Sequence, residues 1–399
     1  MILNRQLEKL GTETAFAVSA EANSWAKKGN KIYPFHLGDI NIQTPLFIRE
    51  ATNRHMNEKK NGYCPSEGIN ELREVLAYDV GSKRNVSYNI DNVIIQPGGK
   101  PTIWKFLATV MNVGDEVLYP NPGYPIYESQ IRYQGGVPIP YGYKEDKNGF
   151  AIDIDRLSND ISSNTKILIY NNYQNPLSAS SSKIEMEKLA EIAIANNLWV
   201  LSDDAYYEMR YSNKPPRSII SIPGMKRRTV ILYTFSKKFA MTGWRIGASI
   251  GPSEIMKQIA RFNINDESCT NHFIQHALAE VLNSNENISG EILEKLKLRR
   301  NLCVEIINSI DGMNIYKPES TFYLFPNISK VLINKGYDNL DKFRIDALKN
   351  TGVSFCTRNH FGTPKIGEES NYIRLAYSGI SRTDIVEGLN KFKKWIEGS

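Results

Sequence analysis

Two adjacent lysines, Lys237 and Lys238, lie in the stretch YTFSKKFAMTGWRIG, residues 233–247. The flanking residues are mostly apolar, VILYTF before the pair and FAM after it. Burial and nearby cations lower the pKa of a lysine, which lets it act as a nucleophile and then as a base. Arg245 follows within a Gly-Trp-Arg turn. The stretch therefore indicates a reactive lysine, with a permanently charged arginine close to it in the chain.

Two other stretches carry groups that would complete a site of this kind. SDDAYYE places Asp203 and Asp204 at the end of an apolar run, where a carboxylate can keep a ring nitrogen protonated. GGKP, residues 98–101, opens a predicted helix, whose N-terminal N–H groups suit a phosphate. Each has a simpler interpretation, since either aspartate could cap a helix and the glycine pair could be only a turn. Together, lysine, carboxylate and phosphate cradle indicate pyridoxal 5′-phosphate (PLP), whose aldehyde forms a Schiff base with lysine.

The elements that must position these groups alternate between strands and helices from about residue 70 to 251. The predicted strands are NVIIQP, DEVLYP, KILIYNN, LWVLSDD, TVILYTF and RIGASIG, with helices such as KPTIWKFLATVMN and KIEMEKLAEIAIANN between them. This order predicts an α/β fold with a mainly parallel sheet and helices on both faces. In such sheets ligands bind at the carboxyl ends of the strands, and the polar groups described above follow strands.

The remaining segments predict a second, smaller α+β unit. A helix from about residue 10 to 30 ends at Gly29, and KIYPFHLGDINIQTP is a strand followed by a loop. After about residue 290 come the helix EILEKLKLRRNLCVEIINSI, the strands TFYLF and NYIRLAYS, and a terminal helix. We predict that residues 1–48 join the small domain, that 49–288 form a large PLP-binding domain, and that 289–399 form the small C-terminal domain.

The amino-acid composition narrows the classes of protein to which this chain can belong. The 399 residues are 41% hydrophobic and 23% charged, as in soluble globular proteins, and no apolar run approaches the ~20 residues of a membrane span. No signal peptide is seen at the start, so we expect a cytoplasmic protein. The net charge of +6 is dispersed, which argues against nucleic acid as a partner. The four cysteines form no CxxC, and His272 and His276 lack a third ligand nearby, so we expect no metal.

At this point the sequence resembles the class I/II aminotransferases, PLP enzymes of fold type I similar to aspartate aminotransferase. The resemblance runs from about Thr12 to the C-terminus. In that family the Schiff-base lysine lies in a pattern like S-K-x-F-x-x-x-G-x-R-x-G, which here begins at Ser236 and ends at Gly247. The match assigns the Schiff base to Lys237. Lys238 occupies a variable position and is expected to point elsewhere, because adjacent side chains diverge.

The resemblance also implies roles around the cofactor. Thr234 and Arg245 match phosphate ligands, and Gly99 and Lys100 would cradle the phosphate through their backbone. Tyr124, in NPGYPIY, matches the aromatic residue that stacks on the pyridine ring. These assignments place the phosphate at the GGKP turn.

Five more positions are implied on the ring and the substrate. Asp203 resembles the partner of the pyridinium nitrogen, and Asn175 and Tyr206 resemble the pair that hydrogen-bonds the 3′ oxygen. Arg374, in NYIRLAYS, matches the arginine that binds the substrate α-carboxylate, and Gly38, in FHLGD, lies beside it. Lys237, Asp203 and Tyr206 are therefore the expected catalytic residues.

Two positions are implied to act across a homodimer with shared active sites. Tyr63 matches a tyrosine that reaches the phosphate of the neighbouring subunit. Aspartate-specific relatives bind the distal carboxylate with an arginine from the partner subunit. Counting back five from Asn271, which matches a loop asparagine of the family, this chain has Asp266. An acid there would favour a basic amino acid, unless the loop NINDESCTN is aligned differently or its acids face water.

The chain departs from the family pattern at three points. Asn175-Pro176-Leu177-Ser178 replaces the usual N-P-T-G, so we expect this loop to take another shape. PEST replaces proline, any residue, glycine and alanine, and GGKP carries a proline where a helix former is common. These changes leave the PLP prediction intact but bear on the substrate.

The predicted activity is transfer of an amino group from an L-amino acid to a 2-oxo acid. The nearest alternative keeps the cofactor and changes the reaction to that of a C–S lyase, decarboxylase, cyclase or oxidase. A transcription regulator with an aminotransferase-like domain is disfavoured, because the match begins near Met1 and leaves no room for a DNA-binding segment. A purely structural role would not require Lys237, Asp203 and Arg374 together.

Overall fold

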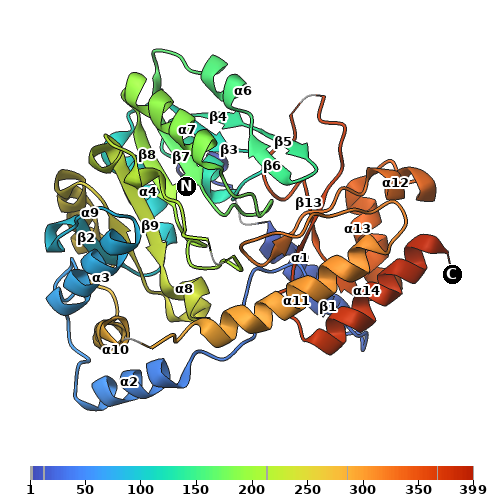
Figure 1. The fold of residues 1–399 in the computed structure, drawn as a ribbon, viewed down its shortest axis with the longest axis horizontal. Coiled ribbons are helices and arrows are strands. Elements are labelled where there is room, and N and C mark those ends of the chain that lie inside the picture. The colour runs from blue at the N-terminus through green and yellow to red at the C-terminus, as the bar shows by residue number, and fades with distance from the viewer. Residues whose placement is uncertain (1–2, 12–13, 213, 285, 366, 399) are drawn as a thin grey trace.

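The protein folds into a large part built on a central sheet and a C-terminal lobe built mainly of helices (Figure 1). The computed structural model describes all residues except 1–2, 12–13, 213, 285, 366 and 399. The large part runs from α2 (Leu46–Asn57) to α10 (His272–Asn283), and the C-terminal lobe runs from α11 (Gly290–Asn308) to α14 (Arg382–Glu397). In Figure 1, α11 extends from the large part across to the lobe.

The central sheet has seven strands in the order β2-β10-β9-β8-β7-β3-β4. The strands are β2 (Val93–Gln96), β3 (Glu116–Pro120), β4 (Val137–Tyr141), β7 (Thr165–Asn171), β8 (Trp199–Asp203), β9 (Thr229–Thr234) and β10 (Gly247–Ile250). Five neighbours from β9 to β4 pair in parallel, whereas β10 is antiparallel to both β9 and β2. The sheet is therefore mainly parallel, as the alternation of strands and helices predicts.

Helices cover both faces of this sheet because its strands are apolar on both sides. Ile167 and Ile169 of β7 pack with α4 (Lys100–Val110), α5 (Ile126–Tyr133) and α9 (Ser253–Asn265), while Leu168 and Tyr170 pack with α7 (Lys183–Ala195). On β2, β9 and β10 the second face is covered by α3 (Asn70–Lys83) and α10. Successive residues of a strand point to opposite faces, so a strand made of a continuous apolar run must be covered on both faces of the sheet.

The C-terminal lobe combines short strands with long amphipathic helices. Strands β11 (Tyr323–Leu324), β14 (Ile373–Ala376) and β13 (Cys356–Thr357) form an antiparallel sheet in that order, and α12 (Ser329–Lys335) and α13 (Leu340–Thr351) complete the lobe with α11 and α14. The N-terminal strand β1 (Tyr33–Pro34) pairs in parallel with β12 (Val353–Ser354). Residues from the N-terminal segment thus enter the lobe's core. The domain boundaries at residues 48 and 288 stay a prediction.

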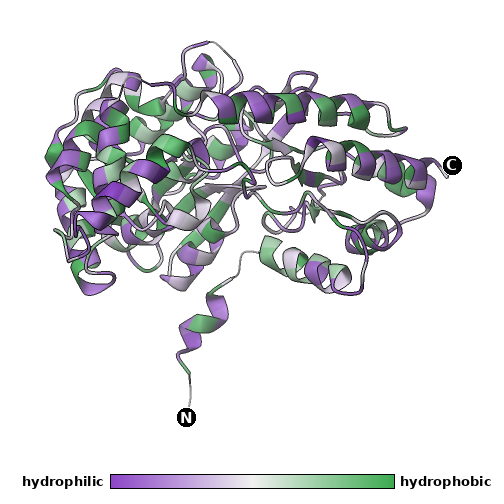
Figure 2. Ribbon diagram, turned by 90° about the horizontal axis from the view of Figure 1, so that it is seen from below, coloured by the Kyte–Doolittle hydropathy of each residue, from purple (hydrophilic) through white to green (hydrophobic). Residues whose placement is uncertain are grey.

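Smaller elements connect these units. They are the helices α1 (Ala15–Ala26), α6 (Ile154–Asn159) and α8 (Phe235–Lys238), the hairpin β5 (Tyr143–Asp146) and β6 (Gly149–Ile152), and the 3₁₀ turns η1 (Arg5–Lys9), η2 (Ile90–Asn92), η3 (Ile219–Ser221), η4 (Lys226–Arg228) and η5 (Thr242–Trp244). Figure 2 shows η1 standing away from the body of the protein. In the described part of the chain, no helix is both long and apolar enough to cross a membrane.

The sequence patterns missed β4 and the β5–β6 hairpin. β4 reads VPIPY, and the two prolines disguise it because proline cannot donate a hydrogen bond within a sheet. Its position explains how the prolines are tolerated, since β4 is the edge strand and pairs only with β3. The predicted N-terminal helix is present as α1, followed by Gly29 at φ +86°; residues 12 and 13 lie outside the described residues.

Candidate active site

A cavity of about 520 Å³ lies where the strands of the central sheet end. Its walls come from segments that follow β2, β3, β7, β8 and β9, from the N-terminal segment, and from the C-terminal lobe. Of the predicted site residues, those lining the cavity are Gly38, Gly99, Lys100, Tyr124, Asn175, Asp203, Tyr206, Thr234, Lys237, Arg245 and Arg374. The fold therefore brings together groups that are far apart in the sequence, as expected at the carboxyl ends of parallel strands.

The two adjacent lysines face different surroundings. Lys237 is half-buried in the short helix α8, lines the cavity, and donates a hydrogen bond from Nζ to the carbonyl oxygen of Gly38 at 2.8 Å. Lys238 binds the carboxylate of Glu208, with Nζ–O distances of 3.1 and 2.9 Å. The Glu208 carboxylate also accepts from Lys83 at 3.0 Å. Only the first lysine is thus available to a ligand in the cavity.

Asp203 ends β8 and is buried, with 6% of its surface exposed. Burial raises the pKa of its carboxyl to about 6, although hydrogen bonds from Tyr127 and from the backbone N–H of Ala205 oppose this shift. The Tyr127 hydroxyl donates to Oδ2 at 2.5 Å. The carboxylate is therefore fixed in place and ready to pair with a cation in the cavity.

The alternative interpretation, in which Asp203 or Asp204 caps a helix, is wrong. Residues 205–208 form turns, and no helix begins at either aspartate. Asp204 instead binds the buried guanidinium of Arg84, at 3.0 Å from Nε and 2.5 Å from Nη2. The two neighbouring carboxylates are therefore separated in function, with Asp204 held by Arg84 and Asp203 lining the cavity.

The turn after β2 brings backbone and an arginine together. Gly99 precedes α4, and a Cβ atom there would lie 2.6 Å from Cδ2 of Leu232. Gly98 has φ +101°, a conformation suited to glycine, and the Arg245 guanidinium lies against it, with Nη2 donating to the carbonyl oxygen of Pro97 at 3.3 Å. Thr234, at the end of β9, caps α8 by accepting from the Ser236 N–H at 3.1 Å. Two helix N-termini and a guanidinium therefore meet at one end of the cavity, an arrangement that suits a phosphate.

Arg374, on β14, lines the opposite side of the cavity and is almost completely buried. Its Nη1 donates to Oδ1 of Asn175 at 3.1 Å, and its Nη2 donates to the carbonyl oxygen of His36 at 2.6 Å. Its Nε is buried without a hydrogen-bond partner among the described residues. Burial and the nearby Arg374 lower the pKa of His36 to about 4, so this imidazole is neutral near pH 7. Arg374 therefore supplies the positive charge here and has a donor to spare for an anionic ligand.

Tyr206 and Tyr323 close the cavity between its two ends. Their hydroxyl oxygens are 2.6 Å apart, and the guanidinium carbon of Arg374 lies 4.5 Å from the centre of the Tyr323 ring. Gly38 is needed beside them, because a Cβ atom at this position would lie 2.2 Å from the Tyr323 hydroxyl oxygen. The large part and the lobe thus meet directly at the site.

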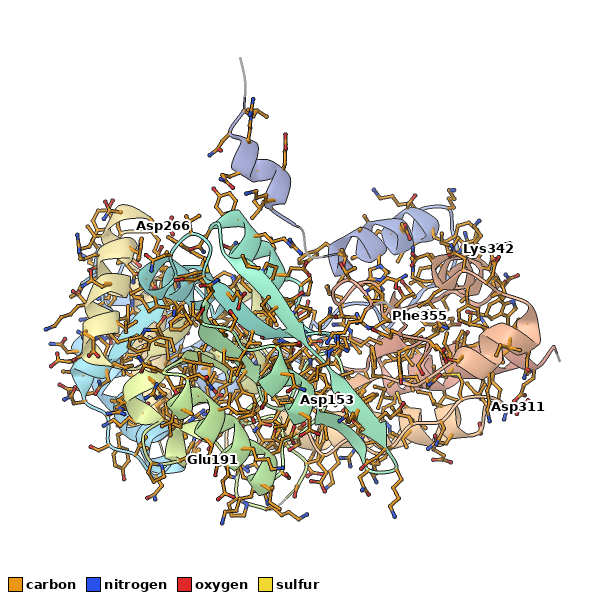
Figure 3. All side chains as sticks on the ribbon, turned by 90° about the horizontal axis from the view of Figure 1, so that it is seen from above. Asp153, Glu191, Asp266, Asp311, Lys342 and Phe355 are labelled. Carbon is orange, nitrogen blue, oxygen red and sulfur yellow. The ribbon has the colours of Figure 1, made fainter. Side chains whose placement is uncertain are left out.

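Two predicted residues lie away from the cavity of their own chain. Tyr63 is 89% exposed and does not line the cavity. Asp266 lies at the end of α9, where Figure 3 shows it on the side of the molecule away from Lys342 in the lobe. Its side chain is 55% exposed, and its Oδ2 is 3.9 Å from Nζ of the buried Lys105. Within one chain, neither residue can reach a ligand in the cavity.

The unusual loop Asn175-Pro176-Leu177-Ser178 keeps a left-handed residue at its end. Ser178 has φ +57°, a left-handed conformation that glycine adopts freely. Ser178 therefore takes the backbone conformation that suits the glycine of the family's N-P-T-G loop. Its hydroxyl bonds to Oγ1 of Thr321 at 2.5 Å and to the carbonyl oxygen of Tyr323 at 2.8 Å. Leu177 is buried against Val18 and Phe325. The departures at residues 175–178 and in PEST therefore contact each other.

Three residues of the site were not singled out from the sequence. Tyr127 holds Asp203, Tyr323 holds Tyr206, and Asn171 accepts from the Asn175 N–H while donating to the Asp203 carbonyl oxygen at 2.9 Å. Tyr127 could have been predicted as a site residue, because it lies three residues after Tyr124 and so on the same side of a helical turn. The Tyr206–Tyr323 and Asn171–Asp203 contacts join segments that are distant in the sequence, so local sequence does not predict them.

Comparison with known proteins identifies the family of the chain. Residues 33–392 match the family model for aminotransferase class I and II. The chain is 31% identical over 399 residues to a probable aspartate/prephenate aminotransferase of Aquifex aeolicus, covering 99% of this chain and 98% of the relative. It is 28% identical over 398 residues to the aspartate aminotransferase of Bacillus subtilis, covering 100% and 99%.

Solved structures agree in fold as well. The aspartate aminotransferase of Thermus thermophilus with maleate superposes with a TM-score of 0.90 at 26% identity, covering 99% of both chains. An alanine aminotransferase from Pyrococcus furiosus superposes with a TM-score of 0.91 at 26% identity, covering 100% of both. The architecture is that of fold type I.

The fold and the cavity together define a PLP-dependent enzyme of fold type I. The chain belongs to the class I and II aminotransferases, and its activity is that of a transaminase. The cavity fits the cofactor, because it combines the buried Asp203, the amine of Lys237, and a glycine turn beside Arg245.

Proposed function

We propose that this enzyme moves the α-amino group of an L-amino acid to a 2-oxo acid through Lys237, and that its preferred substrates are dicarboxylic. The observation that carries the proposal is the convergence of Lys237, Asp203 and Arg374 on one cavity. The three groups come from α8, β8 and β14, so their meeting is specific to the folded chain.

The proposed roles follow from the chemistry of each group. PLP, when bound, supplies an aldehyde that bonds to amines and a ring that accepts the electrons of the substrate Cα–H bond. Asp203 would hold the ring nitrogen protonated, and Nζ of Lys237 would move the proton from Cα. Arg374 would bind the substrate α-carboxylate, leaving the Cα–H bond within reach of Lys237.

The remaining cofactor contacts are proposed from position in the cavity. Thr234, Arg245 and the backbone of Gly99 and Lys100 would hold the phosphate. Tyr124 would lie against the ring, since it lines the cavity at the end of the same sheet. Asn175 and Tyr206 would bond to the ring's 3′ oxygen, and Gly38 would leave space beside the substrate.

The charges around the cavity favour a substrate with two carboxylates. Its lining contains four basic side chains, Lys100, Lys237, Arg245 and Arg374, and two acids, Asp39 and Asp203. If Arg245 binds the phosphate and Arg374 the α-carboxylate, Lys100 can meet a distal carboxylate. The Lys100 ammonium lies 5.8 Å from the centre of the Tyr124 ring, on the side of the cavity where the cofactor is expected. The named activities of the relatives from Aquifex aeolicus and Bacillus subtilis support an acidic substrate.

A basic amino acid is the second candidate. It rests on Asp39, which lines the cavity, and on Asp266, whose partly exposed carboxylate would have to act in a neighbouring subunit. We also propose a homodimer, because the exposed ring of Tyr63 could take part in an active site only in a neighbouring subunit. A competing PLP reaction such as C–S cleavage would release ammonia without an oxo-acid acceptor.

A substrate panel tests the proposal. Purified enzyme with PLP is assayed with aspartate, glutamate, alanine, ornithine, lysine and aromatic amino acids, with and without 2-oxoglutarate. We expect the highest kcat/KM for a dicarboxylic donor and no turnover without the acceptor. Lys100→Gln should raise KM for aspartate while leaving KM for alanine nearly unchanged. A clear preference for ornithine or lysine would replace the dicarboxylic proposal by the basic one.

A further inference from the structure

A second cavity, of about 510 Å³, lies outside the active site and is lined by a concentration of basic side chains. Its lining comes from the β5–β6 hairpin, Tyr173, the serine-rich stretch 178–182, the loop residues Arg210, Ser212, Lys214, Pro215 and Arg217, and the residues Tyr316, Lys317 and Glu319 before β11. In Figure 1 the β5–β6 hairpin points from the large part toward the C-terminal lobe. The second cavity therefore lies at the junction of the two units.

The charge of this cavity is one-sided. Five basic residues line it, Lys147, Arg210, Lys214, Arg217 and Lys317, against the single acid Glu319. None of the five forms an ion pair with any residue that the structure describes. Elsewhere on the surface many lysines and arginines have acidic partners, as Lys31, Lys144 and Arg132 do. Like charges gathered in a concave wall raise the local concentration of anions.

Local contacts hold part of this wall in place. Arg210 donates from Nε to the carbonyl oxygen of Tyr207 at 3.1 Å and from Nη1 to that of Lys214 at 2.7 Å. The Arg217 N–H donates to the Tyr173 hydroxyl at 3.3 Å, which anchors the far end of the loop. These bonds use only the backbone of Lys214 and Arg217, so their charged side-chain ends remain available to a ligand.

Neutral hydrogen-bonding and aromatic side chains also line the second cavity. Ser180, Ser181 and Ser182 line the cavity, and Ser182 caps the N-terminus of α7. Phe150, Tyr173 and Tyr316 add aromatic surface. A bounded cavity of this size fits a small molecule and not an extended polymer.

From the unpaired charges and the concave shape, we propose that the second cavity binds a small multivalent anion carrying phosphate or carboxylate groups. The anion would join Lys147, Arg217 and Lys317, which belong to three separate segments. Two of these segments lie in the large part and one leads into the lobe, so the bound anion would hold the two units together. Ser178 lies on the wall of this cavity, and Asn175 of the same loop lines the active site.

Calorimetric titration of the PLP-loaded enzyme tests the proposal. The cofactor then occupies Lys237 and Arg245, and the variants below distinguish binding in the second cavity from binding at Arg374 and Lys100, which stay open in the active site. The probes are sodium pyrophosphate and, separately, citrate, in a buffer free of both. We expect one equivalent of at least one probe to bind per chain. Binding of pyrophosphate alone would indicate a phosphorylated ligand, and binding of citrate alone a polycarboxylate.

Two triple variants with equal change in net charge distinguish binding in the second cavity from the general attraction of anions to a positively charged protein. The first, K147Q/K214Q/K317Q, removes three cavity charges; the control, K257Q/K330Q/K349Q, removes three exposed charges on α9, α12 and α13. Loss of three cavity charges, including the proposed contacts of Lys147 and Lys317, should weaken binding roughly tenfold in the first variant and leave it within about twofold in the control. If the triple variant does not fold, the single changes Arg217→Gln and Lys317→Gln replace it.

The proposal is overturned if neither probe binds the wild-type enzyme, or if both triple variants weaken binding equally. In the second case the anions would respond only to overall charge. These outcomes are independent of the substrate panel, since they involve no turnover.

Discussion

Lys237 and Lys238 are neighbours in the chain, yet Nζ of Lys237 bonds to the Gly38 carbonyl oxygen inside the active-site cavity while Nζ of Lys238 bonds to Glu208 outside it. The separation is possible because α8 is a short helix, in which adjacent side chains point about 100° apart. Lys83 also donates to the Glu208 carboxylate and so helps to hold Lys238 away from the cavity. The two lysines therefore have different roles, with Lys237 facing the cavity and Lys238 stabilising the structure around it.

The first prediction follows from this separation. Lys237→Ala should lower turnover by more than roughly a thousandfold, because it removes both the nucleophile and the base. Borohydride reduction of the PLP-loaded protein followed by peptide mass analysis should then find no cofactor attached at residue 237. Lys238→Ala is the matched control and should keep the adduct. Loss of the adduct in the Lys238 variant alone would reverse the assignment.

The second prediction concerns the pH dependence of stability in the cofactor-free protein. Burial raises the pKa of Asp203 to about 6, whereas an unfolded aspartate titrates near about 3.9. Between these values the folded state holds more protons, so the contribution of Asp203 to stability falls as pH rises from about 4 to 6 and is constant above. Asp203→Asn removes this titration. The free energy of unfolding of wild type relative to the variant should therefore drop by on the order of 2 kcal/mol across this window.

Urea denaturation at several pH values measures this difference. Glu208→Gln makes a useful contrast, because Lys238 and Lys83 overcome the effect of burial and lower the pKa of Glu208 to about 2. Its stabilising contribution is present above the unfolded value and lost as pH falls through about 2. A wild-type-minus-D203N difference that stays flat from pH 4 to 6 would contradict the raised pKa of the buried Asp203 carboxyl.

The third prediction tests the close approach at the phosphate turn. Gly99→Ala would place a Cβ atom 2.6 Å from Cδ2 of Leu232, so the free energy of unfolding should fall. Overpacking of this kind typically costs about 1–3 kcal/mol, and the affinity for PLP should fall with it. Adding Leu232→Val removes the opposing atom and should restore part of the loss. Gly62→Ala, where no atom lies within 4 Å, should change little.

The fourth prediction tests whether active sites are shared between subunits. Tyr63→Ala should leave the stability of the chain nearly unchanged, because this side chain is 89% exposed, and should weaken the binding of PLP in the assembled enzyme. Mixing Tyr63→Ala with Lys237→Ala and allowing subunits to exchange should restore activity, since one site of each hybrid dimer then has both wild-type residues. Size-exclusion chromatography with light scattering would report the dimer. Mixtures no more active than the separate variants would count against shared sites.

The fifth prediction concerns the loop that departs from the family pattern. Ser178→Ala loses two buried hydrogen bonds, to Thr321 and to the Tyr323 backbone, and should destabilise the protein by about 1–3 kcal/mol. Ser178→Gly loses the same bonds but relieves the left-handed backbone, which costs a residue with a Cβ atom roughly 1 kcal/mol. Chemical denaturation should therefore rank wild type first, the glycine variant second and the alanine variant last. The reverse order of the two variants would show that backbone strain is unimportant at φ +57°.

The sequence by itself determined the class of fold and the reactive groups. Apolar strands alternating with helices predicted a mainly parallel sheet, and the resemblance to the family's motif assigned the reactive role to Lys237 over Lys238. Both signals are local, because strand, helix and turn preferences act over a few residues. The edge strand β4 escaped because its prolines contradict the usual strand pattern, and only its place at the edge makes them tolerable.

Tertiary structure alone decided which groups support the reactive ones and where charge accumulates. Tyr127 holds Asp203, Arg84 holds Asp204, and the Tyr206–Tyr323 contact joins the large part to the lobe. The second cavity likewise gathers basic residues from three separate segments. Such contacts depend on how distant segments pack, since the energy of a buried charge or hydrogen bond is set by neighbours that the local sequence does not specify.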